Sequence, residues 1–238
     1  MRSTKVYGQY CPVAKSLDIV GDRWTLLIVR DLLRGKQRFK ELQGSLRGIA
    51  PNLLSDRLKR LEESGLVVRT IFKQIPPKVE YTLTDTGRAL ESVLGSLARF
   101  GMANLMEDPS NDEVIDPGFI FQAMPSLFVT ARAKGIDAIV RFDISGDGGG
   151  TWFVKVSSRG CRVTSRSATD PTVTIATDAH TFGAMAVGSL DPKKAGSKGK
   201  LKISGDKALA ERFPHLFVNR DDAIGASPKV ARGRTSAS

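Results

Sequence analysis

The sequence predicts an α+β protein with two domains, and three observations support this. The chain has 238 residues, which is longer than one typical domain. Apolar residues recur at helical spacing before residue 108, whereas β-branched and aromatic runs with Gly-rich turns dominate after residue 137. A polar, acidic stretch separates the two patterns. We therefore predict domains at residues 1–108 and 118–222, a linker at 109–117 and a disordered basic tail at 223–238.

Four helices are expected first. Proline is favoured at the first helical position and glycine just past the last one, and these residues delimit the segments. The clearest helix begins at Pro51: its leucines 54, 58 and 61 share one face, and its other face is polar. The expected helices are Pro12 to Val20, Arg23 to Arg34, Phe39 to Gln43 and Pro51 to Ser64.

A β-hairpin and a long helix complete the first domain. Leu66 to Phe72 and Lys78 to Leu83 are rich in strand-forming residues, and the basic, proline-containing segment 73–77 joins them. Thr84 is a suitable N-cap for a helix that continues to Met106 and carries a broad apolar stripe.

This order of elements is typical of a winged helix-turn-helix, in which the recognition helix enters the major groove of DNA. The alternative is a generic small α+β domain. The net charge of +11, spread over both halves of the chain, favours a polyanionic partner and hence double-stranded DNA. Arg57 lies beside the apolar stripe, so it is expected either to form an internal ion pair or to reach a phosphate. The candidate DNA-binding residues are Asn52, Ser55, Lys59 and Arg60 on the helix and Lys73 and Lys78 on the hairpin.

Several segments closely resemble the HxlR family of bacterial transcriptional regulators: residues 11–14 (CPVA), 21–28 (GDRWTLLI), 38–42 (RFKEL), 51–58 (PNLLSDRL) and 77–81 (PKVEY). The resemblance spans most of residues 10–100 and implies a dimeric DNA-binding regulator. One departure is Ala50, where the family commonly has Ser or Thr; without a capping oxygen the recognition helix loses about 1 kcal/mol. DNA binding is expected to survive this loss.

The long helix is the expected homodimer contact. Leu90, Leu97 and Phe100 would be exposed in a monomer, and a broad apolar stripe usually finds a partner. Relatives in the resembling family are dimers, while the second domain of the same chain is the alternative partner for this stripe.

Cys11 is a candidate redox-sensing residue. It occupies the N-cap before Pro12, where helix N–H groups and nearby Lys15 favour the thiolate. Some regulators resembling this chain sense electrophiles through a cysteine at the matching position. The alternative is a buried, inert capping residue.

The second domain is expected to combine an antiparallel sheet with helices. Pro125 should kink or divide the first helix. Strands are expected at Asp137 to Ile144, Thr151 to Ser157, Cys161 to Thr164, Thr172 to Ala176 and Lys200 to Ile203, and helices at Phe119 to Lys134, Asp178 to Val187 and Asp206 to Arg212.

Residues 178–182 (DAHTF), 188–192 (GSLDP), 199–206 (GKLKISGD) and 214–217 (PHLF) resemble the sterol carrier protein 2 family. The resemblance implies a fold that can enclose a hydrophobic small molecule, although a solid core is the equal alternative. The candidate pocket residues are Phe128, Phe142, Trp152, Phe153, Phe182, Met185 and Leu201.

Catalytic, metal and cofactor sites are not expected. His180 and His215 are the only histidines, and with the two distant cysteines they form no metal-ligand spacing. The glycine run 146–150 does not fit G-x-G-x-x-G, and Lys194 stands where a phosphate loop ending at Gly199-Lys200 needs its first glycine, so both segments are interpreted as turns. No G-x-S-x-G motif is present.

The cellular location follows from the same sequence. Two distant cysteines indicate a reducing compartment. The start, Met-Arg-Ser-Thr-Lys, is not followed by the apolar region of a signal peptide, and no apolar run approaches the ~20 residues of a membrane helix. We therefore expect a cytoplasmic protein with no membrane partner.

The leading hypothesis is a dimeric transcriptional regulator whose DNA affinity responds to a hydrophobic ligand in the second domain or to thiol chemistry at Cys11. The alternative is a lipid- or acyl-binding carrier that the basic domain merely localises.

Overall fold

The computed structural model describes residues 6–35, 37–75, 77–107, 109–110, 113, 115–165, 170–218 and 222. The chain divides into two compact units, Met1–Leu94 and Gly95–Ser238. The division lies inside helix α6 (Leu90–Asn104), before the 109–117 linker expected from the sequence, because Ala98 and Met102 pack against the core of the second unit. That linker stays a prediction, and the expected tail at 223–238 lies outside the described residues.

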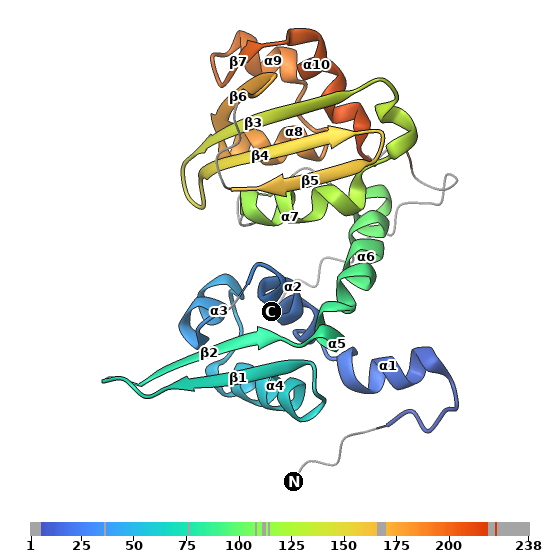
Figure 1. Ribbon diagram of the computed structural model, residues 1–238, viewed down its shortest axis with the longest axis vertical. Helices are drawn as coiled ribbons and strands as arrows, with labels where there is room; N and C mark the ends of the chain where they lie inside the picture. The colour runs from blue at the N-terminus through green and yellow to red at the C-terminus, as the bar shows by residue number, and fades with distance from the viewer. Residues whose placement is uncertain are drawn as a thin grey trace, which may run out of the picture. The chain divides into compact units, whose positions relative to one another are not determined.

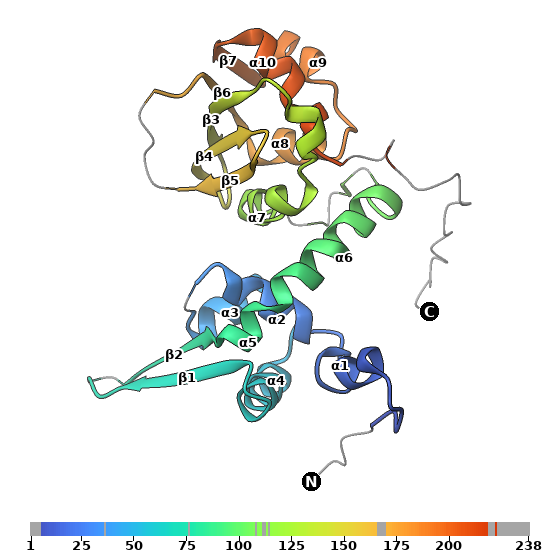
Figure 2. The same ribbon diagram turned by 45° about the vertical axis from the view of Figure 1, so that its right-hand side comes forward.

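The first unit contains the helices and the hairpin expected from the sequence, with ends that differ by one or two residues. The strands pair antiparallel, with Val67 opposite Leu83 and Phe72 opposite Lys78, and the hairpin extends beyond the helices of its unit (Figures 1 and 2). The elements are α1 (Pro12–Val20), α2 (Thr25–Leu33), α3 (Phe39–Ser45), α4 (Pro51–Glu63), β1 (Val67–Phe72), β2 (Lys78–Leu83) and α5 (Asp85–Arg88), followed by the first residues of α6.

The core of the first unit is built around α4. Leu54, Leu58 and Leu61 are at most 1% exposed and pack with Ile28, Val29, Leu32 and Leu42. A buried carboxylate, Asp31, joins α2 to α3: it pairs with Arg30 at 2.8 Å and accepts a hydrogen bond from the Ser45 hydroxyl. This bond fixes the end of α3 directly before the turn into α4.

The predicted long helix after Thr84 is interrupted. The Thr84 hydroxyl accepts a hydrogen bond from Gly87 N at 3.0 Å and donates one to the Gly65 carbonyl at 2.7 Å, so it caps only the short helix α5. The main helix, α6, begins at Leu90. The N-cap prediction is therefore confirmed, whereas the prediction of one continuous helix is wrong at residue 89.

The second unit has one five-stranded sheet with the order β5-β4-β3-β6-β7. Three of its strand pairs are antiparallel as expected, but β3 and β6 are parallel. The chain forms β3, β4 and β5 as a meander and then crosses to the other edge of β3, where β6 pairs in the parallel direction. The strands are β3 (Asp137–Ser145), β4 (Gly150–Ser157), β5 (Gly160–Thr164), β6 (Val173–Asp178) and β7 (Leu201–Gly205).

The helices of the second unit pack on one face of this sheet, and Figure 1 shows α8 behind the strands. Pro125 lies inside α7, which continues to Leu127; the break falls at residues 128–129 instead of at the proline. The sequence interpretation missed α9, which Asp191 caps, and both 3-10 turns. The elements are α7 (Pro117–Leu127), η1 (Thr130–Ala133), α8 (Ala179–Ala186), α9 (Pro192–Ser197), α10 (Lys207–Arg212) and η2 (Phe213–Leu216).

We expect the substitution Gly87→Ala to destabilise the first unit. A Cβ at Gly87 would lie 2.1 Å from the Leu66 carbonyl oxygen, and overpacking of this kind costs about 1–3 kcal/mol. Denaturant unfolding followed by circular dichroism measures the loss. As a control, Gly44→Ala in α3 meets nothing within 4 Å and should be neutral or slightly stabilising. Equal stability of the two variants would contradict this view of the α5 packing.

Candidate nucleic-acid interface

Helices α3 and α4 and the turn between them form a helix-turn-helix. Leu46 N donates to the Leu42 carbonyl at 3.0 Å, and Ile49 N donates to the Leu46 carbonyl at 3.1 Å, so the turn is held by its own backbone. Leu46 and Ile49 are buried in the first core. As expected, Ala50 provides no side-chain cap for α4, which begins at Pro51.

The outer face of α4 is exposed and polar. Asn52, Ser55 and Lys59 are all solvent-exposed, as expected from the spacing of the buried leucines. The side-chain oxygen Oδ1 of Asn52 accepts a hydrogen bond from Leu53 N at 2.9 Å, which holds the amide group at the first turn of the helix. This face presents hydroxyl and amide groups, the groups that read base edges in a major groove.

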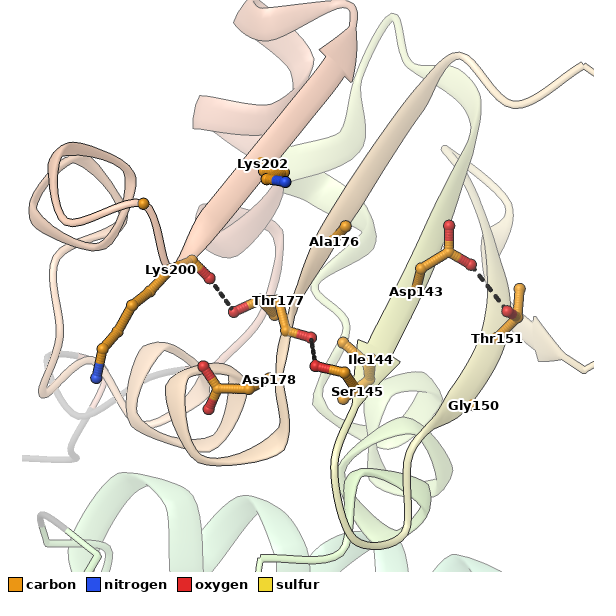
Figure 3. A pocket seen from close by; sticks show the side chains of 11 residues that line it. Asp143, Ile144, Ser145, Gly150, Thr151, Ala176, Thr177, Asp178, Lys200 and Lys202 are labelled. Carbon is orange, nitrogen blue, oxygen red and sulfur yellow. Dashed lines mark hydrogen bonds between the residues drawn. The ribbon is translucent and has the colours of Figure 1, made fainter.

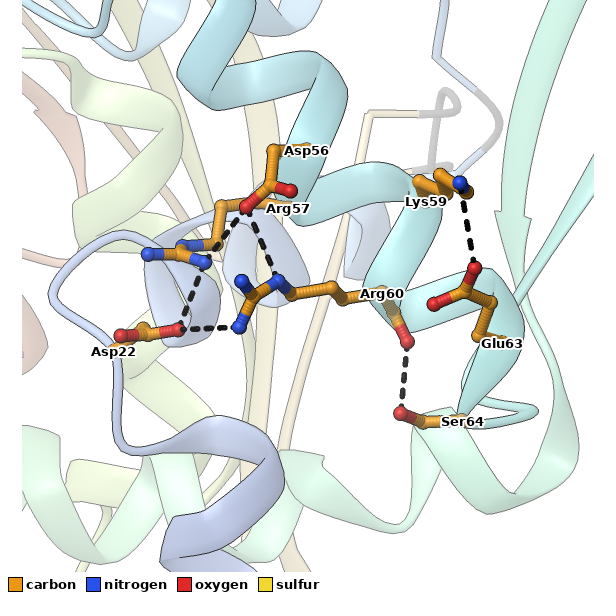
Figure 4. A network of polar contacts seen from close by, with 7 residues as sticks. All are labelled: Asp22, Asp56, Arg57, Lys59, Arg60, Glu63 and Ser64. Atoms are coloured by element: carbon orange, nitrogen blue, oxygen red, sulfur yellow. Dashed lines mark hydrogen bonds and ion pairs between the residues drawn. The ribbon is translucent and has the colours of Figure 1, made fainter. Parts of the chain in front are cut away.

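Both arginines of α4 belong to an ion-pair network with two aspartates (Figure 4). Arg57 pairs with Asp22 at 2.9 Å and with Asp56 at 3.0 Å. Arg60 pairs with Asp56 at 3.1 Å and with Asp22 at 3.9 Å. Of the two alternatives for Arg57, the structure shows the internal ion pair, and Arg60, expected toward the DNA backbone, is held in the same network.

Lys59 is also paired, but loosely. Its ammonium lies 3.7 Å from the Glu63 carboxylate one helical turn away, and its side chain is 75% exposed. An exposed pair of this kind contributes little to stability and breaks readily. Lys59 thus keeps access to a phosphate, whereas Arg57 is mostly buried.

The hairpin of β1 and β2, which is the wing of the motif, carries one exposed lysine and one lysine that is paired with a carboxylate. Lys73 is exposed at the end of β1. Lys78 is half-buried: its ammonium lies 2.5 Å from the Glu80 carboxylate and 5.3 Å from the centre of the Phe72 ring. The two wing candidates are therefore not equivalent, because the Lys78 charge already has a partner inside the hairpin.

Three exposed cations near the helix-turn-helix were missed by the sequence interpretation. Arg38 is the N-cap residue of α3, Lys40 lies in its first turn, and Arg47 lies in the turn before α4. Among the described residues, none of their side chains forms an ion pair with a carboxylate. Their position beside the first helix of the motif, which crosses the DNA backbone in such folds, is the signal that could have found them.

The candidate pocket residues of the second unit fall into two sets. Phe128, Phe142, Phe182 and Leu201 belong to the core, and Trp152 and Met185 pack against it. Phe153 lies on the opposite face of the sheet, because it is the direct neighbour of Trp152 on β4 and faces Arg141 of β3. Its assignment to the same pocket is therefore wrong.

Aromatic stacking fills the interior between sheet and helices. The Phe121 ring stacks on Trp152 at 4.6 Å and on Phe182 at 4.9 Å, and it meets Phe142 edge-on at 5.2 Å. Phe121 is only 1% exposed. The rings expected to line a cavity instead contact one another as in a solid core.

The two cysteines lie in different surroundings. Cys11 is half-buried at the N-cap of α1, and its side chain makes no capping hydrogen bond. Cys161 lies in β5, where burial raises the pKa of its thiol to about 12. Within the described residues, no group of three His, Cys, Asp or Glu side chains could hold a metal ion. No described helix is long and apolar enough to cross a membrane.

Two families match the two parts of the chain. Residues 19–109 match the HxlR-like helix-turn-helix family, and residues 124–218 match the SCP-2 sterol transfer family. Between them lie residues 110–123, which overlap the linker expected from the sequence.

Similar proteins point to the same class for the first part. The uncharacterized HTH-type transcriptional regulator YvaP of Bacillus subtilis (strain 168) is 39% identical over 114 residues, 48% of this chain and 96% of YvaP. YdeP of the same strain, another uncharacterized HTH-type transcriptional regulator, is 41% identical over 91 residues, 38% of this chain and 71% of YdeP. Among solved structures, the reduced form of the transcriptional regulator YodB from B. subtilis is 34% identical, with a TM-score of 0.37 over 43% of this chain and 100% of YodB.

We expect Cys161 to resist alkylation in the native protein. With a raised pKa of about 12, only about one thiol in 10⁴ is ionised near pH 8, and the thiolate is the reactive form. Iodoacetamide treatment followed by peptide mass spectrometry should show modification of Cys11 before Cys161. In denaturing urea both should react. Native alkylation of Cys161 at the rate of Cys11 would contradict the burial of this thiol.

Proposed function

The chain belongs to the HxlR-like helix-turn-helix family, and from this premise we propose that it is a dimeric regulator in which α4 reads a specific DNA sequence. At the coarser level the chain is a transcriptional regulator of the helix-turn-helix type. The proposal adds the reading residues, the phosphate contacts and the dimer.

One observation carries the proposal: α4 buries Leu54, Leu58 and Leu61 almost completely and leaves its polar face open. The helix has 13 residues, or about 20 Å at 1.5 Å per residue. Asn52 and Ser55 lie in its N-terminal half, the part of a recognition helix that contacts base edges. We assign base reading to these two residues.

Phosphate contacts come from cations outside the paired network of α4. Lys73 on the wing and Arg38, Lys40 and Arg47 around α3 are exposed. Lys59 can exchange Glu63 for a phosphate because both side chains of that pair are largely exposed. These contacts position the duplex, while the amide and hydroxyl groups select its sequence.

A second copy of the chain is the proposed partner of two exposed apolar stripes. Val93, Leu97 and Phe100 are 43%, 48% and 57% exposed and lie at positions i, i+4 and i+7 of α6. Val13 and Leu17 form a shorter stripe on α1. Burial of such stripes in a symmetric dimer predicts half-sites related by two-fold symmetry.

Two kinds of regulation were expected from the sequence, and they receive different support. A hydrophobic ligand would have to displace Phe121 from its stack with Trp152 and Phe182, which disfavours both this route and the lipid-carrier alternative. Cys11 is accessible enough to react and begins α1, a helix of the proposed dimer contact. We therefore favour the thiol route.

The test of DNA reading begins with operator selection from random DNA using the purified protein. Asn52→Ala should then weaken binding to the selected site by about 1–3 kcal/mol, because a bidentate amide–adenine contact has this value. Fluorescence anisotropy with selected and scrambled duplexes measures the effect. Affinity for scrambled DNA should not change, since phosphate contacts dominate it.

The control is Ser158→Ala, at an exposed position in the turn between β4 and β5 of the second unit. It should bind the selected site as the unchanged protein does. Failure of the wild-type protein to prefer any sequence at physiological salt would refute the proposed function, and so would an Asn52 variant with undiminished specific affinity.

The dimer is tested by Leu97→Asp, which places a charge in the centre of the α6 stripe. Light scattering coupled to size-exclusion chromatography should show a dimer for the wild type and a shift toward monomer for the variant, because an unpaired charge is costly to bury. Val68→Asp, on an equally exposed apolar residue of β1, should remain dimeric. A monomeric wild-type protein at micromolar concentration would contradict the assignment.

A further inference from the structure

A polar hollow of about 640 Å³ lies in the second unit, at the ends of strands β3, β6 and β7 (Figure 3). It lies on the face of the sheet opposite the aromatic core. Lys200 and Lys202 alternate with the core residues Leu201 and Ile203, and Ala176 alternates with the buried Ile175 and Thr177. The lining comprises Asp143, Ile144, Ser145, Gly150, Thr151, Ala176, Thr177, Asp178, Gly199, Lys200 and Lys202.

One register row of the sheet forms the floor of the hollow. Thr151, Asp143, Ala176 and Lys202 are direct neighbours on four adjacent strands. Strands lie about 4.8 Å apart, so Asp143 and Lys202 start about 10 Å from each other with only the Ala176 methyl between them. They form no ion pair with each other, and the small alanine leaves the space between them open.

Ser145 and Asp178, which are direct neighbours on β3 and β6, have their polar groups satisfied. The Ser145 hydroxyl donates to the Thr177 carbonyl at 3.4 Å. The two oxygens of Asp178 accept from Thr181 N at 2.8 Å and from the Thr181 hydroxyl at 2.6 Å. Burial alone would raise the pKa of Asp178, but these hydrogen bonds and the Lys200 charge outweigh it and hold the pKa below the ordinary value. Asp178 is therefore an ionised carboxylate, and each of its two oxygens already accepts a hydrogen bond from Thr181.

Two groups in the floor row keep unused capacity. Asp143 Oδ1 accepts from the Thr151 hydroxyl at 2.8 Å and from Arg141 at 3.1 Å, while its other oxygen has no hydrogen bond from any described residue. The Lys202 ammonium pairs with no described carboxylate. The second Asp143 oxygen and the Lys202 ammonium thus belong to residues that both line the hollow, and the Asp143 carboxylate leans toward Thr151 (Figure 3).

We propose that this hollow binds a small monocarboxylate that also carries a hydroxyl or amino group. The carboxylate pairs with Lys202, and the hydroxyl or amino group donates to the unused oxygen of Asp143 across Ala176. Two lysines and two aspartates line the hollow, so it has no excess of positive charge for a dianion. The volume is within the range of small-molecule sites. The site is separate from the proposed DNA contacts and does not depend on them.

Isothermal titration calorimetry on the full chain tests the proposal with three probes: β-hydroxybutyrate, β-aminobutyrate and butyrate. The first two should bind saturably. Butyrate has the same carboxylate but no donor for Asp143, so it should bind about tenfold more weakly, which corresponds to one hydrogen bond to a charged group. Equal binding of butyrate would overturn the role of Asp143.

Two variants and one control locate the site. Lys202→Gln should weaken binding of β-hydroxybutyrate about tenfold or more, and Ala176→Leu should abolish it by filling the floor. Lys155→Gln removes the same charge from the same sheet face outside the hollow and should bind as the wild type does. Circular dichroism confirms that each variant is folded. The proposal is overturned if neither donor-bearing probe binds, if folded Ala176→Leu or Lys202→Gln binds normally, or if Lys155→Gln loses binding equally.

Discussion

The burial of three leucines on α4 determines how the first unit meets its surroundings. Leu54, Leu58 and Leu61 are packed against α2 and α3 with almost no exposure. A helix of 3.6 residues per turn anchored by such a stripe has no rotational freedom, so its opposite face points away from the core. The buried Asp31–Ser45 bond fixes the approach of α3 to the same helix. The exposure of Asn52 and Ser55 on α4 depends on this orientation.

The two faces of the sheet in the second unit have different chemistry, and a shift of one residue separates them. Trp152 stacks on Phe121 in the core, whereas its neighbour Phe153 lies on the other face beside Arg141. The chain matches the SCP-2 sterol transfer family there, but a fold does not determine a ligand, because function depends on the particular site. In this chain aromatic rings stack in the interior, and a polar hollow lies on the opposite face of the sheet.

Most helices and strands could be predicted because proline, glycine and apolar spacing act locally. Pro51 and Gly65 delimit α4, and the leucines between them specify its buried face. The features that were missed depend on tertiary structure. The ion pair of Arg60 with Asp22 joins residues far apart in the sequence, whereas the ion pair of Arg57 was one of its two expected alternatives. The parallel pairing of β3 with β6 depends on where the returning chain finds a free edge, and α9 is too short for periodicity to reveal. Phe153 was expected in the same pocket as Trp152, but neighbouring residues of a strand point to opposite faces of the sheet.

The network of Asp22, Asp56, Arg57 and Arg60 has a consequence for the ionic-strength dependence of binding. Salt sensitivity in protein–DNA association counts the condensed counterions that protein cations displace from the duplex. An arginine that keeps its carboxylate partner displaces none, so α4 adds fewer released ions than its basic side chains would indicate. Such a helix adds little to the sequence-independent electrostatic affinity for the phosphate backbone. On the proposed function, specificity of α4 for an operator would then come mainly from its uncharged groups.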